Sequence, residues 1–462
     1  MELKPFFWEN VASFQGNAIW TDRGEVLSYR DLDQAVTAIG EHLHRQQGLA
    51  LLIARNSVSC LTHYLAFLRS RVPFILLDCK SGQAVVDATI ERFSPTVVIE
   101  FGSDEAKWSA TTFKAKPVHP DLALILPTSG SSGVAKSVMI SYTNLQANAE
   151  SIVAYLGLHP NERAITSLPF AYSYGLSVIN THLLVGAGLI LTDYSLLDKP
   201  FWQTLKTLCA TSMAGVPFHF EIMEKLRFRD MPLPHFQTLT QAGGKLSLKL
   251  AECFAGYAIG SDRRFFMMYG QTEATARIAY LAVHENPGKV GSIGRVIPGG
   301  KLYLADDNGA QVVEPNQAGE LIYEGPNVML GYALTQDDLI MPTLPNKLET
   351  GDVGEFDDDG FFWITGRKSR FIKLKGKRID LDALQNALRD QGWDLWLTGD
   401  DTRLEIILGH GQNRSQLESE LFDLLSLHHS LLKIVEIKSF PMTANGKPDY
   451  PKMRELIDAV CP

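Results

Sequence analysis

Residues 127–137, PTSGSSGVAKS, follow the apolar run LALIL at 122–126, as a phosphate-binding loop follows a strand. A P-loop of the Walker type requires Gly, four residues, and then Gly-Lys-Ser/Thr. Here Ala135 stands where the second Gly is needed, and its Cβ hinders close approach of the backbone to a phosphate. The alternative is a longer loop whose hydroxyl and backbone N–H groups surround a polyphosphate, with Lys136 supplying a point charge. The hydroxyls would come from Thr128, Ser129, Ser131 and Ser132.

The residues before this loop alternate between strand and helix patterns. A hairpin is predicted over 18–29, and the S-x-x-D cap from Ser28 to Asp31 predicts a helix carrying Leu32, Val36, Ile39 and Leu43. Apolar runs predict strands at 49–54, 74–78 and 96–100, with helical patterns between them. This alternation predicts an α/β fold with parallel strands, and a further helix is expected to begin near Thr143.

The pattern changes after Gly291. Short β segments with many Gly, Pro and Asn turns run to Gly331 and predict a small β subdomain. A boundary is expected near 366–370, dividing the chain into an N-terminal domain, 1–367, and a C-terminal domain, 368–462.

Composition excludes several classes of protein. The 462 residues, 45% hydrophobic and 21% charged, are typical of a globular chain, and the net charge of −9 argues against a nucleic-acid binder. The five cysteines are scattered and form no C-x-x-C pair, which favours reduced thiols. No signal peptide or apolar run long enough to span a membrane is evident, so we expect a cytoplasmic location.

Five ordered motifs give the chain a family resemblance. TSGSSGVAK (128–136), YGQTE (269–273), GELIYEGPNVMLGY (319–332), ETGDVGEFDDDGFFWITGR (349–367) and TANGKPDY (443–450) resemble the signature segments of the adenylate-forming superfamily. That superfamily includes acyl-CoA synthetases, nonribosomal peptide synthetase adenylation domains and luciferases. The resemblance implies a large α/β N-terminal domain with a β subdomain and a small mobile α/β C-terminal domain. Ala135 replaces the Pro of the family loop, a mild departure.

The resemblance implies that a carboxylate attacks the α-phosphate of ATP. Glu273 would bind Mg²⁺, Thr272 would contact the α-phosphate, and Asp352 would accept hydrogen bonds from the ribose hydroxyls. Arg367 would contact ribose and phosphate at the domain junction. The remaining ATP-binding positions would hold the leaving phosphates or line the adenine and acyl pockets: Thr128, Ser129, Gly130, Ser131, Ser132, Gly133, Lys136, Gly243, Gly244, Tyr269 and Gly270.

Two C-terminal positions are assigned to alternating steps by the resemblance. Lys447 would stabilise charge between the carboxylate and the α-phosphate as the adenylate forms, and Gly376 would line a tunnel for a pantetheine thiol. Ser369 occupies the hinge position, where the family usually has Asp or Lys. The basic run at 367–378, RKSRFIKLKGKR, predicts a half-buried strand with Ile372 and Leu374 inward, and it could also face CoA phosphates or an acidic carrier protein.

The segment LPFAYSYGLS at 168–177 resembles a pocket segment of the family, with Tyr172 in place of His. None of these residues is acidic, although amino-acid-activating members carry an Asp there for the substrate ammonium, so an aryl or aliphatic acid is expected. Val216 and Pro217 would form another wall. Arg277 is either a structural ion-pair partner, which we favour, or a contact at the end of the pocket.

These residues predict an AMP-forming acid ligase that uses ATP and Mg²⁺ and transfers the acyl group to CoA or to an acyl carrier protein. The sequence leaves that choice of acceptor open. A non-catalytic nucleotide-binding regulator would have no use for Lys447, and a Walker NTPase would release ADP rather than AMP.

Overall fold

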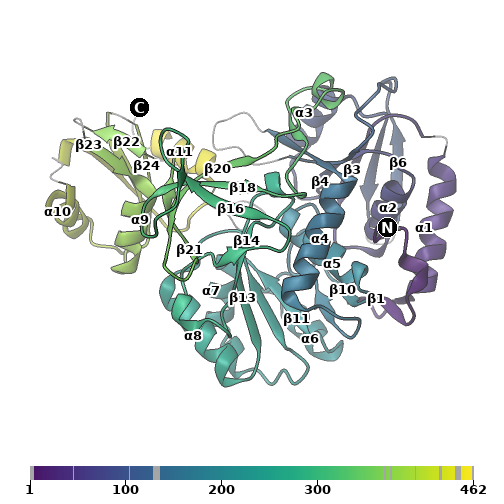
Figure 1. Ribbon diagram of the computed structural model, residues 1–462, viewed down its shortest axis with the longest axis horizontal. Helices are drawn as coiled ribbons and strands as arrows, with labels where there is room; N and C mark the ends of the chain where they lie inside the picture. Colours follow the sequence, from purple (N-terminus) through teal and green to yellow (C-terminus); the bar gives the residue numbers. More distant parts are fainter. Residues whose placement is uncertain are drawn as a thin grey trace.

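The structure is a computed structural model that describes residues 5–44, 46–102, 105–127, 136–368, 371–374, 377–400, 402–425, 429–442 and 449–459. It is a mixed α/β protein, which confirms the expected fold class, and Figure 1 shows a large N-terminal part beside a smaller green-to-yellow C-terminal part. No helix in the described ranges is both long and apolar enough to cross a membrane.

The first sheet has the order β19-β8-β7-β4-β3-β5-β6. Its strands are β3 (Ala50–Ala54), β4 (Phe74–Asp78), β5 (Val97–Phe101), β6 (Ala106–Ala110), β7 (Leu122–Pro127), β8 (Ser137–Ser141) and β19 (Gly331–Ala333). Strands β3, β4, β5 and β7 pair in parallel, as the alternating pattern predicted. Helices α1 (Tyr29–Leu43), α2 (Val58–Arg69) and α3 (Gln83–Phe93) connect this region, and α1 begins with the expected Ser28–Asp31 capping box.

The second sheet has the order β15-β14-β13-β12-β11-β9-β10-β1-β2. Its strands are β1 (Asn17–Thr21), β2 (Val26–Ser28), β9 (Arg163–Ile165), β10 (Gly188–Leu191), β11 (Ser212–Gly215), β12 (Thr238–Gln241), β13 (Arg264–Tyr269), β14 (Ala279–Ala282) and β15 (Arg295–Val296). Its helices are α4 (Tyr142–Leu156), α5 (Ser173–Leu184), α6 (Lys199–Thr207), α7 (Pro217–Lys225) and α8 (Leu248–Gly260). Strands β1 and β2 form the predicted hairpin.

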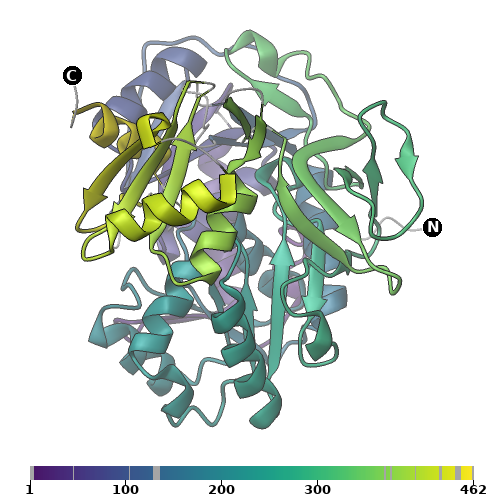
Figure 2. The same ribbon diagram turned by 90° about the vertical axis from the view of Figure 1, so that its left-hand side faces the viewer.

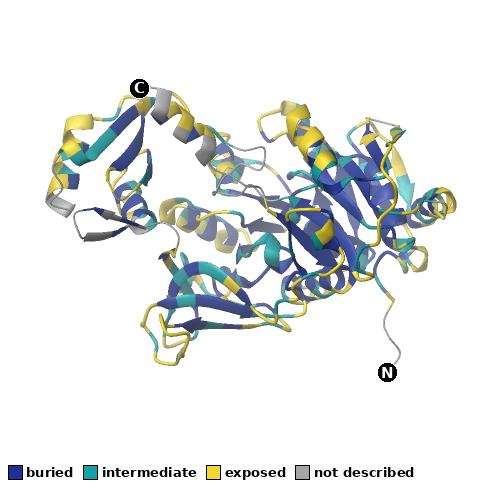
Figure 3. Cartoon of the chain, turned by 90° about the horizontal axis from the view of Figure 1, so that it is seen from above, coloured by how far each residue is buried: buried dark blue, intermediate teal, exposed yellow. Residues whose placement is uncertain are grey.

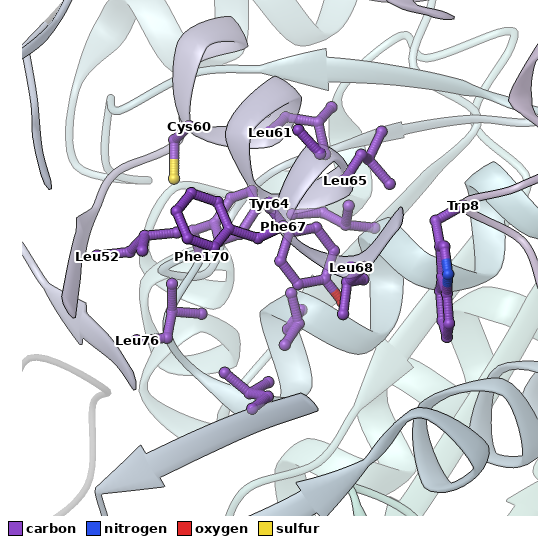
Figure 4. Packing of buried hydrophobic residues seen from close by; sticks show 14 of the residues in the cluster. Trp8, Leu52, Cys60, Leu61, Tyr64, Leu65, Phe67, Leu68, Leu76 and Phe170 are labelled. Carbon is purple, nitrogen blue, oxygen red and sulfur yellow. The ribbon is translucent and has the colours of Figure 1, made fainter. Parts of the chain in front are cut away.

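The largest hydrophobic cluster joins these two sheets through α2, α4 and α5. Figure 4 shows Tyr64 and Phe67 of α2 packing near Phe170, and the rings of Tyr64 and Phe170 meet edge to face at 5.5 Å. Figure 3 shows the buried residues, in dark blue, filling the interior of the large part. Because α5 is covered on several sides, the loop before it is held on a rigid base.

A third sheet, with the order β17-β16-β18-β20-β21, forms a β subdomain, but its strands lie between Lys301 and Arg367 rather than within the expected 291–331. Its strands are β16 (Lys301–Ala305), β17 (Gln311–Val312), β18 (Gly319–Glu324), β20 (Leu348–Phe356) and β21 (Phe362–Arg367). Single-turn 3₁₀ helices are η1 (Val11–Ser13), η2 (Phe228–Asp230), η3 (Thr272–Ala274), η4 (Pro287–Lys289), η5 (Asp337–Leu339) and η6 (His429–Leu431).

The C-terminal part has its own hydrophobic clusters, built from residues 372–457. Its elements are β22 (Phe371–Leu374), β23 (Lys377–Asp380), α9 (Leu381–Asp390), β24 (Leu395–Gly399), β25 (Leu404–Gly409), α10 (Arg414–Leu425), β26 (Leu432–Ile437) and α11 (Tyr450–Ala459). Ile372 and Leu374 of β22 are buried, as expected. Helix α9 contacts β21, and Figure 2 shows the C-terminal part from its outer side.

Candidate active site

The carboxyl ends of parallel strands collect the candidate residues. Strands β9, β11, β12 and β13 run in parallel, so the loops that follow them meet at one edge of the sheet. In open α/β sheets this edge is where ligands bind. The loops contain Tyr172, Val216, Gly243 and Gly270, four of the positions that the motifs predicted.

Tyr332 brings together two predicted ATP-site residues from distant segments. Its hydroxyl donates a 2.8 Å hydrogen bond to Oε1 of Glu273, and Nζ of Lys136 lies 4.7 Å from the centre of its ring. Burial, and then the Glu273 charge, raises the pKa of Tyr332 far above its usual value, so the phenol remains a donor. The Lys136 cation and the Glu273 carboxylate therefore contact the same aromatic side chain.

The residues directly after YGQTE adopt an unusual backbone. Thr275 and Ala276 have φ angles of 51° and 108°, in the left-handed region that non-glycine residues rarely adopt. Such strain costs about 1–3 kcal/mol per residue and is held by its surroundings. A Cβ on Gly270 would lie 2.0 Å from the carbonyl oxygen of Ala276, so only glycine fits at that position. Oγ1 of Thr272 lies 3.3 Å from Oγ of Ser173 at the start of α5.

Hydrogen bonds from Asn327 connect this strained loop to the β subdomain. Its amide Nδ2 donates to the carbonyl oxygens of Ala274 at 2.7 Å and Arg277 at 2.8 Å, and its Oδ1 accepts from the Tyr323 hydroxyl at 2.7 Å. Asn327 is 1% exposed, so these bonds are shielded from water. The loop that carries Thr272 and Glu273 is thereby fixed by a residue fifty positions further on.

Asp352 and Arg367 face each other across β20 and β21. They are direct cross-strand partners, and Nε of Arg367 donates a 2.6 Å bond to Oδ1 of Asp352. Oδ2 of Asp352 accepts from the Tyr269 hydroxyl and, at 3.1 Å, from the amide of Gln271. Burial, and then the Asp352 charge, raises the pKa of Tyr269 well above its usual value. Although desolvation opposes it, the same carboxylate raises the pKa of Arg367, so this guanidinium stays charged.

The predicted acyl-pocket residues also pack together. A Cβ on Gly243 would lie 2.5 Å from the Tyr172 hydroxyl and 3.0 Å from Cγ1 of Val216, and one on Gly244 would lie 3.2 Å from Cγ of Pro217. Gly243 also has a φ of 83°, which favours glycine. These two glycines therefore let the wall formed by Tyr172, Val216 and Pro217 close against the backbone.

Arg277 differs from the structural role that we favoured. It is 2% exposed, and no ion pair found among the described residues includes it. Its guanidinium instead lies 4.3 Å from the centre of the Tyr174 ring and donates to the Ala276 carbonyl and the Ser177 hydroxyl.

Several predicted residues lie outside the described part of the chain. They are Thr128, Ser129, Gly130, Ser131, Ser132, Gly133, Ala135, Ser369, Gly376 and Lys447. Their assigned roles therefore remain predictions.

Sequence reasoning missed the residues that hold the site from a distance. Asn327 and Tyr332 lie within the quoted motif at 319–332 but received no role, and Gln271 lies within YGQTE. The signal that could have identified these three residues was their position inside the two quoted motifs. Their partners become neighbours only through the packing of β18 and β19 against the rest of the fold.

Comparison with known proteins identifies the family. The model of the AMP-binding enzyme family matches residues 7–333, well over half of the chain. The protein belongs to the AMP-binding enzyme family, whose members are adenylate-forming enzymes, and this confirms the predicted class.

Individual relatives are distant. The chain is 31% identical over 274 residues to a long-chain-fatty-acid–CoA ligase of Salmonella typhimurium, covering 58% of this chain and 47% of the ligase. It is 25% identical over 414 residues to luciferin 4-monooxygenase of Nipponoluciola cruciata, covering 83% and 71%. The structure of o-succinylbenzoate CoA synthetase from Bacillus subtilis, solved with an acyl-adenylate intermediate, superimposes with a TM-score of 0.80, 20% identity, and coverage of 98% and 99%.

Proposed function

We propose that this protein is an ATP-dependent carboxylic acid ligase that forms an acyl adenylate and releases pyrophosphate. In the proposed reaction, a carboxylate oxygen of the acid forms a bond to the α-phosphorus. The bond from that phosphorus to the bridging oxygen of the β-phosphate breaks, and pyrophosphate leaves. The acyl group then passes to a phosphopantetheine thiol of CoA or a carrier protein, and AMP is released. Family membership supports this class of reaction.

The observation that carries the proposal is the meeting of Lys136 and Glu273 on Tyr332. Attack on a phosphate of ATP needs positioning and neutralisation of charge more than covalent help from the protein. Lys136 supplies a cation for the leaving phosphates, and Glu273 supplies a hard oxygen ligand that fits Mg²⁺. Bound Mg²⁺ would neutralise phosphate charge.

Asp352 and Arg367 fit the nucleotide end of the proposed reaction. The Asp352 carboxylate, held by Tyr269, Gln271 and Arg367, would accept hydrogen bonds from ribose hydroxyls. Because Asp352 side-chain exposure is only 4%, its geometry is fixed before a nucleotide arrives.

The segment 168–177 supports a limit on the acid. It contains no carboxylate to pair with a substrate ammonium, so the proposed substrate lacks an α-amino group. Tyr172, buried against Gly243 and Val216, offers only a phenol and an aromatic ring to the acid.

The test is ATP–pyrophosphate exchange over a panel of carboxylic acids, with the nucleotide product identified by mass spectrometry. We expect exchange with acids that lack an α-amino group, and AMP as product when a pantetheine thiol is supplied. Steady release of ADP would favour the Walker NTPase, and exchange driven by proteinogenic amino acids would contradict the substrate limit.

A further inference from the structure

A small cavity lies beside Arg277, among α4, α5, β11, β12 and β13. Its volume is about 30 Å³, and its polar lining includes Arg277, His182, Ser212, Thr238 and Thr240. One water needs about 10–15 Å³ of such volume. The cavity therefore has room for about two waters, or for the two oxygens of one carboxylate.

Four of the residues that line this cavity each carry a buried side-chain polar atom with no hydrogen-bond partner in the described structure. These atoms are Nε of Arg277, Nε2 of His182, Oγ of Ser212 and Oγ1 of Thr238. The four residues are between 1% and 6% exposed. Buried polar atoms are almost always bonded in folded proteins, so a group of four around one cavity indicates that a polar ligand belongs there.

The charge of this group is positive. The other contacts of Arg277 are a backbone carbonyl, the hydroxyls of Ser177 and Tyr155, and the Tyr174 ring, and all of these groups are neutral. The nearby buried carboxylate of Glu162 is bonded to Arg264 and Thr211 at 2.7 Å each. A buried guanidinium without an anion is costly, which favours a ligand that carries negative charge.

His182 and the hydroxyls complete the binding chemistry. Nδ1 of His182 lies 2.8 Å from the carbonyl oxygen of Val178, so Nδ1 carries the ring proton and Nε2 is an acceptor. Burial lowers the pKa of His182, which keeps the ring neutral. Ser212 and Thr238 can each donate one hydrogen bond to an anion or to Nε2 of His182, whereas Arg277 can only donate.

The cavity lies next to the acid pocket. The Tyr174 ring, which lines the cavity, is 6.2 Å from the ring of Tyr172, and the Tyr174 hydroxyl bonds Thr240 at 2.8 Å. Along α5 the neighbouring Ser173 faces Thr272, the residue assigned to the α-phosphate. The start of α5 thus connects the proposed reacting centre, the pocket wall and the cavity.

We propose that this cavity is the far end of the acid pocket and that Arg277, with Ser212 and Thr238, binds a second carboxylate of the substrate. The inference rests on the proposed function and names its substrate class, a dicarboxylic acid without an α-amino group. One carboxylate of the diacid reacts with ATP, and the other neutralises the buried guanidinium.

The test compares pairs of acids that have the same carbon skeleton and differ in whether the far end is a methyl or a carboxylate group. For the wild-type protein we expect kcat/KM in pyrophosphate exchange to favour the diacid by about 10²-fold or more, because an uncharged end leaves the buried polar groups unpaired. Arg277→Met should lower the value for the diacid by about 10²-fold and that for the monoacid much less. The loss should appear in KM for the acid and not in KM for ATP.

Two further variants keep the result interpretable if Arg277→Met does not fold. Thr238→Val retains the guanidinium and should lower use of the diacid by about tenfold. Arg263→Met is the matched control, because Arg263 also contacts an aromatic ring, that of Tyr257 at 5.0 Å, but does not line the cavity. It should leave the ratio of diacid to monoacid unchanged.

The outcomes separate the two proposals. Exchange with monoacids, no advantage for diacids and equal losses in the variants would mean that the cavity holds water only, and would overturn the second carboxylate site. If no acid drives exchange, the proposed ligase function itself fails. A preference for diacids that disappears in Arg277→Met supports both.

Discussion

Tyr332 joins two residues of the proposed ATP site, although its sequence motif gave it no role. The ring supports the Lys136 ammonium, and the hydroxyl holds Glu273 at 2.8 Å. The two functions of the side chain can be separated, because Phe retains the ring and loses only the hydroxyl. Substitutions of Tyr332 therefore test directly whether Glu273 is the metal ligand.

Tyr332→Phe is expected to lower adenylate formation by about tenfold or more, since a hydrogen bond to a charged group contributes about 1.5–3 kcal/mol. The variant should also need more Mg²⁺ for half-maximal rate, because Glu273 is less well fixed. Tyr332→Leu should be worse, since it also removes the ring beside Lys136. Pyrophosphate exchange against Mg²⁺ concentration measures both effects.

Tyr303→Phe is the control for this change. The Tyr303 hydroxyl donates a 2.9 Å bond to Glu324 on the β subdomain, a similar pair away from the candidate site. Its loss should leave the Mg²⁺ dependence unaltered. A wild-type Mg²⁺ profile in Tyr332→Phe would remove the support for Glu273 as the metal ligand.

At the scale of elements, the loop of η3 is shaped by the segment between β18 and β19. Thr275 and Ala276 adopt left-handed backbone angles, and Asn327 bonds the carbonyl groups on either side of them. The position of Thr272 and Glu273 thus depends on a side chain that touches neither ATP nor acid in the proposed reaction.

Asn327→Ala should lower the free energy of unfolding by about 2–4 kcal/mol, because it leaves buried carbonyl groups and the Tyr323 hydroxyl without partners. Pyrophosphate exchange should fall as well, since the strained loop loses its support. Denaturant unfolding and exchange rates of one preparation measure the two losses. Asn286→Ala, which removes a single 3.2 Å bond to Ala282, should have little effect on either.

Helix α7 carries a partly buried histidine, His219, that should affect stability in acid. Desolvation lowers the pKa of His219 to about 4 from 6.5. As pH falls below 6.5 the unfolded chain takes up a proton and the folded chain does not, so stability is lost between pH 6.5 and pH 4. The loss by pH 4 is on the order of 3 kcal/mol, given about 1.4 kcal/mol per pKa unit.

His219→Gln should reduce the slope of stability against pH in that window. The measurement is the difference in unfolding midpoint between the variant and the wild-type protein from pH 7 to pH 4, which cancels the contribution of the other histidines. Parallel curves for the two proteins would show that His219 does not titrate as its burial requires.

The sequence predicted the elements with strong local patterns and missed those that depend on distant partners. Strand β4 and the Ser28 cap follow from local runs of residues and match the structure. Strand β8 was not predicted, because its five residues directly precede a helix and pair with β7 and with β19. Asp352 and Arg367 were found by motif, whereas their register as cross-strand partners emerges only from the sheet.

At the scale of the whole molecule, we propose that the chain divides near residue 367 into two domains that move relative to each other. The hydrophobic clusters of residues 372–457 share no member with the clusters before residue 365. Arg367, which ends β21, is bonded to Asp352, and strand β21 contacts α9 of the C-terminal part. Rotation about a hinge directly after Arg367 would change which residues of the C-terminal domain face the nucleotide.

If the C-terminal domain alternates, Lys447→Ala should lower adenylate formation by about 10²–10³-fold, the scale for losing one preorganised charge at a transition state. Supplied with preformed acyl adenylate and a pantetheine thiol, the same variant should form thioester at close to the wild-type rate. Gly376→Trp should show the reverse pattern. Equal slowing of both steps by Lys447→Ala would contradict alternation and would direct attention to Ser369.

The pairing of β8 with β19 has a consequence for synthesis on the ribosome. Met139 lies opposite Gly331, so β8, which follows the glycine-serine loop, has an unpaired edge until the chain beyond Ala333 has emerged. An open strand edge attracts other chains, and nascent proteins with such edges are prone to aggregate. Fragments that end before residue 331 should therefore need chaperones to stay monomeric, and the sheet that contains β8 is completed only after most of the chain has been translated.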